Sequence, residues 1–337
     1  MTDNYLYSNI LLLEERGVGL YNYKNTIDEI FDYVVRHISQ SYGSYLHRPQ
    51  KIPQFSISKE LTKRIDFIKN LRIVIKPIIV DEYTEDKYGV ADTEGTKLVD
   101  NVLNKAAIRL MIQVNKLSGD VYEHVFYNTL YHELNHLYQL YCVMKKHGVR
   151  NAEDSQPAVV EHIKDLDREE LKTKIFSQDP NYFRADYFSY LFYYIFDKFE
   201  FNAKIAGLYG DVKSFYDKNI KFDKAVEKTE AYGAHQILCR YLDAMVLSLS
   251  DKEFADMMNL LKLHGVKKVW NTKQSFLRRM KFWLDKFLKK IGKTASLYYD
   301  ELTDISEIDE CYIIDMCYGN AGLTELDKNL KKYFKND

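Results

Sequence analysis

Cysteine is scarce in this sequence, with four residues in a chain of 337. No two of them form a CxxC pair, and their scattered spacing lacks the pattern of a small disulfide framework. This absence excludes a cysteine-ligated zinc site and favours reduced thiols in a cytoplasmic protein. The four residues are Cys142, Cys239, Cys311 and Cys317.

Long apolar runs are also missing. A membrane-spanning helix needs about 18 uninterrupted apolar residues, and even the apolar run at 190–196 ends at Asp197 and Lys198. The N-terminus carries no basic group ahead of its short apolar run at 10–13, so it does not resemble a secretory signal. We therefore expect no membrane span and a cytoplasmic location, with association with a virion as an alternative setting.

Neither charge sign is in excess, since the formal net charge is −1 and 29% of the residues are charged. This balance is typical of an ordinary soluble protein and argues against nucleic acid as a partner. The apolar fraction of 46% argues against disorder. A chain of this length allows one large mixed unit with appendages or two domains.

The first half of the sequence mixes helical and strand-like patterns. Apolar spacing predicts a helix at 24–42 and a shorter one at 60–71. The β-branched run at 72–83 predicts a strand in which Pro77 requires an edge or a bend. A second strand is expected at 107–115, and the polar, glycine-bearing stretch at 83–97 is typical of a loop.

The rest of the sequence is helical in pattern. A long helix is expected from a capping signal at 118–120 to Gly148, and further helices follow to the C-terminus. These patterns predict an α+β fold, predominantly helical, with a small sheet packed on the long helix. We divide it into an N-terminal helical segment at 1–59, a core at 60–215 and a helical C-terminal region at 216–337.

The long helix contains the sequence HELNH at 132–136. Residues four apart lie on one helix face about 6 Å apart, so His132 and His136 can direct ring nitrogens at one metal ion. Glu133 lies about 100° further round the helix and can take a proton from a water on that metal. The alternative is that all three are satisfied polar residues of a core helix.

A catalytic zinc of this kind needs a third protein ligand. The residues that follow His136 contain no HExxHxxGxxH extension, so the ligand must come from another element. Glu200 is the best candidate, because it lies among phenylalanines, where an unpaired carboxylate is costly. The alternative is that Glu200 is solvated or pairs with Lys204 at i+4.

HELNH on a helix after a strand, followed some sixty residues later by E-F-N-A on a second helix, resembles the gluzincin type of zincin metallopeptidase. It resembles in particular uncharacterised HExxH proteins of bacteriophages and bacteria. The resemblance implies zinc bound by His132, His136 and Glu200, with Glu133 as general base for hydrolysis of a peptide or protein substrate. The sequence lacks the Asn-Glu-x-x-Ser-Asp form of the third-ligand helix.

The same resemblance implies that the strand before the active-site helix binds extended substrate along its edge, a role that we assign to 107–115. Tyr209 and His235 are candidate oxyanion donors by chemistry alone. Two other classes of function stay open. One is a non-catalytic structural or interaction protein, such as a virion component that retains the fold; the other is a metal-stabilised regulator.

A basic, aromatic stretch at 267–293 carries ten Lys or Arg against one Asp. Such an amphipathic helix can bind an acidic protein partner or an anionic surface. The alternative is a surface helix whose aromatic face packs into the core and whose charge is neutralised by the acidic run at 300–310.

Overall fold

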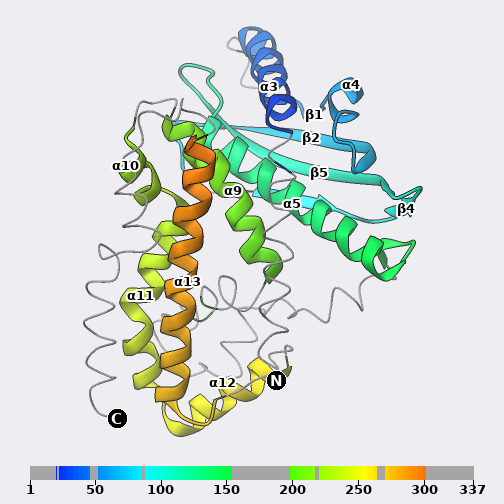
Figure 1. Cartoon of the computed structure of the whole chain (residues 1–337). Coiled ribbons are helices and arrows are strands. Elements are labelled where there is room, and N and C mark those ends of the chain that lie inside the picture. The colour runs from blue at the N-terminus through cyan, green and yellow to red at the C-terminus, as the bar shows by residue number, and fades with distance from the viewer. Residues whose placement is uncertain are drawn as a thin grey trace. The chain divides into compact units, whose positions relative to one another are not determined.

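The computed structural model describes residues 20, 23–45, 52–84, 88–153, 188, 191, 198–216, 220–263 and 270–300. The chain divides into two compact units, residues 1–159 and 160–337. The first carries a sheet and the second is built from helices, so the expected α+β class is confirmed (Figure 1). The three-part division at 59/60 and 215/216 stays a prediction.

The sheet of the first unit is small and mixed. Its strand order is β1-β2-β5-β3, and β4 pairs with β5 beside β3. The two long strands, β2 and β5, run parallel, whereas β1, β3 and β4 are antiparallel to the strands they pair with. The strands are β1 (Phe55–Ser56), β2 (Ile68–Val80), β3 (Tyr88–Asp92), β4 (Lys97–Val99) and β5 (Val102–Asn115).

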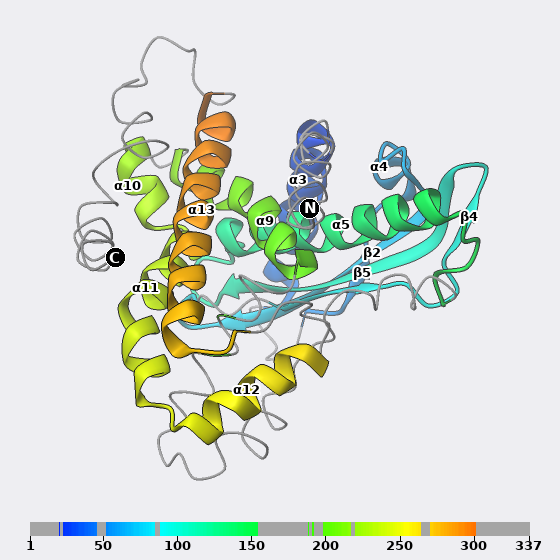
Figure 2. The same ribbon diagram turned by 60° about the horizontal axis from the view of Figure 1, so that its bottom comes forward.

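One face of this sheet is covered by helices α3 (Lys24–Tyr45) and α5 (Glu123–His147), which lie above β2 and β5 in Figure 2. Alternate residues of the two long strands point to this face, and Ile73, Ile75 and Ile108 among them are fully buried. Tyr127 of α5 donates a hydrogen bond of 2.8 Å to Asp28 of α3, which ties the two helices together.

The two ends of α5 differ. Tyr122 is its N-cap and provides no side-chain hydrogen bond, so the capping signal expected at 118–120 does not cap the helix. Ser118 instead ends a turn in which Asn115, at the end of β5, accepts hydrogen bonds from the backbone N–H groups of Leu117 and Ser118. At the other end Gly148 adopts a left-handed conformation (φ 66°), which only glycine adopts without strain. The predicted end of the helix is confirmed.

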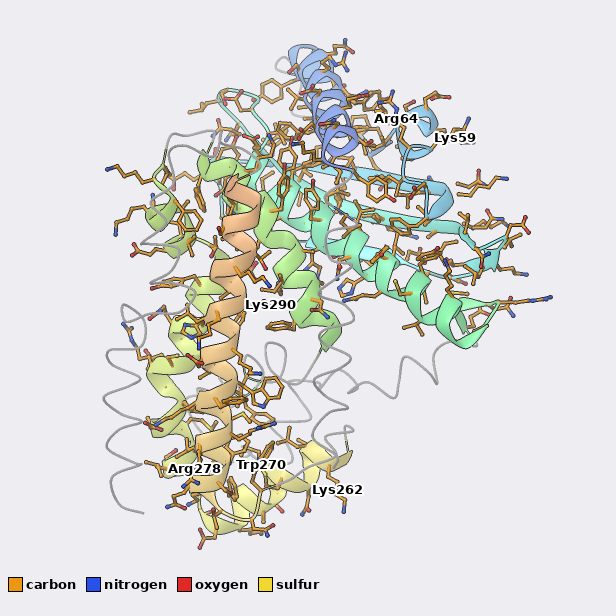
Figure 3. All side chains as sticks on the ribbon, viewed as in Figure 1. Lys59, Arg64, Lys262, Trp270, Arg278 and Lys290 are labelled. Carbon is orange, nitrogen blue, oxygen red and sulfur yellow. The ribbon has the colours of Figure 1, made fainter. Side chains whose placement is uncertain are left out.

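Two local predictions are wrong. The helix expected at 60–71 is a single turn, α4 (Lys59–Thr62), because Ile68 and Leu71 are buried as part of β2. Arg64, which follows α4, pairs with Glu29 of α3 (Figure 3). The loop expected at 83–97 contains the whole of β3 and the start of β4, because both strands find hydrogen-bonding partners in β5, which follows this segment in the sequence.

A third correction concerns the strand at 107–115. This segment belongs to β5, which pairs with β2 on one side. On the other side residues 107–111 pair with β3, and Val114 forms a bridge with Val121. Residues 107–111 therefore offer no free edge to a substrate. β3 is the last strand on that side of the sheet, and no described strand pairs with its outer edge. Pro77 lies beyond the residues of β2 that pair with β1, as its missing N–H requires.

The second unit packs its helices around one apolar core. Phe276 and Phe287 of α13 are buried in it, so the aromatic face of the basic stretch packs inward. Figure 3 labels Lys290, whose Nζ lies 5.2 Å from the ring centre of Phe201. The helices are α9 (Lys198–Tyr216), α10 (Phe222–Glu227), α11 (Glu230–Ser248), α12 (Asp251–Leu263) and α13 (Lys273–Asp300).

Some expectations lie outside the described residues. The acidic run at 300–310 lies there beyond Asp300, and so does the apolar run at 190–196 apart from Leu191. None of the described helices combines the length and the apolar character that a membrane span needs.

Candidate metal centre

His132 and His136 converge on α5 as their spacing predicts. The distance between their Nε2 atoms is 3.1 Å, and their rings are inclined by 80°. Two nitrogen ligands of a tetrahedral zinc lie about 3.3 Å apart, since each Zn–N bond is about 2.0–2.1 Å long. The observed separation is close to that value, so this pair of donors fits a zinc ion. The same distance also suits a hydrogen bond between the two rings.

Gln139, one turn further along α5, holds the second histidine. Its Oε1 lies 3.3 Å from His136 Nδ1, and its side chain is buried. A carbonyl oxygen only accepts, so this contact is a hydrogen bond when His136 Nδ1 carries the proton. In that tautomer the lone pair of His136 is on Nε2, the atom that faces His132. This is the form of imidazole that binds a metal.

Glu133 lies on the neighbouring face of α5, beneath the edge strand β3. A Cβ atom at Gly89 of β3 would lie 2.7 Å from Glu133 Oε1 and 2.5 Å from Thr129 Cγ2. Glycine is therefore required for the strand to pass this close to the carboxylate. The bare backbone of Gly89 forms one wall around the Glu133 side chain.

The Glu133 side chain is buried, with 6% of its surface exposed. Within the described part of the chain, no hydrogen-bond donor or cation contacts its carboxylate. The two oxygens are not among the fully buried polar atoms that lack a partner, so they reach solvent. Water can therefore satisfy the carboxylate when no ligand is present. This arrangement is the kind that a general base needs, because its oxygens stay available to accept a proton.

The third ligand is not identified by the geometry. Among the described residues, no group of three His, Cys, Asp or Glu side chains comes together around a point. Glu200 lies in the first turn of α9, in the second unit, and its side chain is outside the described set. Lys204, the alternative partner expected for Glu200, donates a hydrogen bond of 3.0 Å to Glu230 of α11.

The two candidate oxyanion donors both lie within the second unit. Tyr209 and His235 are almost fully buried there. His235 packs between Cys239, whose Sγ is 3.4 Å from its Nε2, and the ring of Phe287. Burial lowers the pKa of His235 from 6.5 to about 4, so the imidazole is neutral at neutral pH. Its position is that of a core residue of the helical unit.

Sequence reasoning missed two residues of this centre. Gln139 had a visible signal, because a residue three positions after a histidine on a helix reaches the same face. Gly89 had none, because its role depends on a strand that pairs with β5 and crosses above α5.

No protein-family model, curated protein or solved structure matches this chain.

Proposed function

We propose that the protein is a zinc-dependent metallopeptidase. One observation carries the proposal: two imidazole Nε2 atoms lie 3.1 Å apart on the helix that also carries Glu133, a residue with 6% of its surface exposed whose carboxylate pairs with no described group. His132 and His136 hold the metal in this proposal, and Glu200 supplies the third ligand. A structural zinc site would not need the carboxylate, which is the part specific to hydrolysis.

When bound, zinc lowers the pKa of a coordinated water towards about 7 and polarises a carbonyl group. Glu133 accepts the proton of the attacking water and passes it to the leaving amine. Its carboxylate is suited to this role because the wall formed by Gly89 and Thr129 confines it on the side towards β3.

The edge strand β3 is the element that we propose binds substrate, in place of β5. An extended peptide can add to a free strand edge through main-chain hydrogen bonds, and side-chain pockets then give specificity. Gly89 is the residue of this strand that lies against the Glu133 side chain of α5. A peptide on its outer edge would therefore run close to the proposed base, which a peptide beside the interior strand β5 could not do.

A second candidate function is that of a non-catalytic structural or interaction protein, for example a virion component. The observation that favours it is the His132–His136 contact itself, since the two rings satisfy each other by a hydrogen bond without any metal. A metal-stabilised regulator would keep the zinc and lack the hydrolysis.

A peptide-library cleavage assay of the zinc-loaded protein separates these candidates. We expect wild type to cleave and Glu133→Gln to lose activity by about 10²–10⁴-fold, because the amide cannot accept the proton. Zinc content should be equal in both. Cleavage by both proteins to the same extent would contradict the role of Glu133 as general base, and cleavage by neither would favour a scaffold.

A further inference from the structure

Gln139 has the geometry of a residue that prepares His136 for a metal before the metal arrives. Its Oε1 faces His136 Nδ1 at 3.3 Å, and its side chain has only 3% of its surface exposed. A buried side chain keeps its orientation because few rotamers remain available to it. The contact joins positions i and i+3 of one helix, so helical geometry brings the two side chains together.

The orientation of the Gln139 amide decides which nitrogen of His136 can bind. With Oε1 towards Nδ1, the proton is on Nδ1 and the lone pair is on Nε2, facing His132 Nε2 at 3.1 Å. With the amide reversed, its NH₂ group would donate to Nδ1 and the proton would move to Nε2, where it would block the metal. Only the first orientation suits two nitrogen ligands.

We propose that Gln139 is the positioning residue of the metal centre, fixing the tautomer and ring orientation of His136 so that Nε2 is free to bind zinc. This inference rests on the proposed function, because it assumes that the two histidines bind zinc. Second ligand shells of this kind typically change metal affinity by about 10- to 100-fold.

Three variants test the role by zinc competition against a chromophoric chelator. Gln139→Leu removes the acceptor at similar volume, and we expect about 10- to 100-fold weaker zinc binding. Gln139→Glu restores an acceptor, and its affinity should return to within a few-fold of wild type. Asn135→Leu is the matched control. Asn135 is a buried amide of the same helix (7% exposed), and its Nδ2 has no hydrogen-bond partner.

A nitrogen NMR measurement on the zinc-free protein gives a readout that is independent of zinc. Long-range proton–nitrogen correlations should place the His136 proton on Nδ1 in wild type, and Gln139→Leu should shift the tautomer population towards Nε2–H. A merely structural role for Gln139 would change stability without this shift.

The outcomes separate the inference from the proposed function. A wild-type protein that binds no zinc overturns the proposed function. Zinc binding that is equally tight in wild type and Gln139→Leu overturns the inference alone, as does an Nε2–H tautomer of His136 in wild type. An equal loss of affinity in Asn135→Leu also overturns it, because the effect would then belong to any change in this helix.

Discussion

Two pairs of potential metal ligands lie at the same i, i+4 spacing in the two units of this protein. His132 and His136 are half-buried on α5, and their Nε2 atoms face each other at 3.1 Å. His235 and Cys239 lie on α11 within an apolar core, against Phe287. The comparison teaches that spacing selects a helix face and that the surroundings decide what the face can bind.

The difference is chemical as well as positional. Burial lowers the pKa of His235 to about 4 and raises the pKa of the Cys239 thiol to about 12. A thiol binds metal only as a thiolate, so this pair is poorly prepared for a metal at neutral pH. The α5 pair is only half-buried, and Gln139 contacts the Nδ1 atom of His136.

Removing one histidine from each pair should give the largest contrast. His136→Ala removes a proposed ligand, and we expect it to lose stoichiometric zinc in metal analysis of the purified protein. His235→Ala should keep the full zinc content, although it leaves a cavity in the helical core and lowers stability by about 2–4 kcal/mol. Loss of zinc in His235→Ala with retention in His136→Ala would reverse the assignment of the two pairs.

Replacing the proposed third ligand should have the next largest effect. Glu200→Ala should lower zinc affinity strongly in chelator competition, because two histidines alone form an incomplete site. Glu230→Ala is the matched control, since Glu230 is an acidic residue of the same unit that pairs with Lys204. Equal affinities of wild type and Glu200→Ala would assign the third ligand to another residue.

Substituting alanine for Gly89 in the edge strand β3 should lower catalysis without changing zinc binding. Gly89→Ala places a Cβ atom 2.7 Å from Glu133 Oε1, so the carboxylate must move. We expect a fall in peptide cleavage of about 10²-fold, the cost of a displacement of about 1 Å, with zinc content unchanged. Val90→Ala, at an exposed position of the same strand (59%), should leave cleavage unchanged. Equal activity of Gly89→Ala and Val90→Ala would contradict the proposal that β3 forms part of the active site.

The smallest predicted effect is a pH dependence of stability in the second unit. The unfolded chain protonates His235 below about pH 6.5, whereas the folded chain does so only near pH 4. The free energy of unfolding should therefore fall between these values, by about 3 kcal/mol for this group. Denaturant unfolding of wild type and His235→Gln at pH 7 and pH 4 checks this, and an identical loss in both proteins would contradict it.

Sequence patterns predicted the elements whose signal is local. α3 follows from apolar periodicity, the end of α5 from Gly148, and most of β2 and β5 from their β-branched and apolar runs. The convergence of His132 and His136 follows from helical spacing. Patterns failed for β3, a five-residue strand with a glycine that gains its stability from pairing with β5. They also failed to show that β5 is interior, since strand order depends on contacts between distant segments.

The candidate site also has a part that local sequence predicts and a part that it does not. His132, Glu133 and His136 lie within five residues of one helix, so their relative positions follow from helix geometry. The carboxylate's position beneath Gly89 and the identity of the third ligand depend on other elements, which no local pattern specifies.

The zinc content of the purified wild-type protein tests the central claim most directly. The α5 centre predicts one zinc ion per chain, lost in the double variant His132→Ala/His136→Ala and retained in His235→Ala. Substoichiometric zinc in wild type, after purification without chelators and with zinc supplied, would contradict the claim and leave the two histidines as a hydrogen-bonded pair.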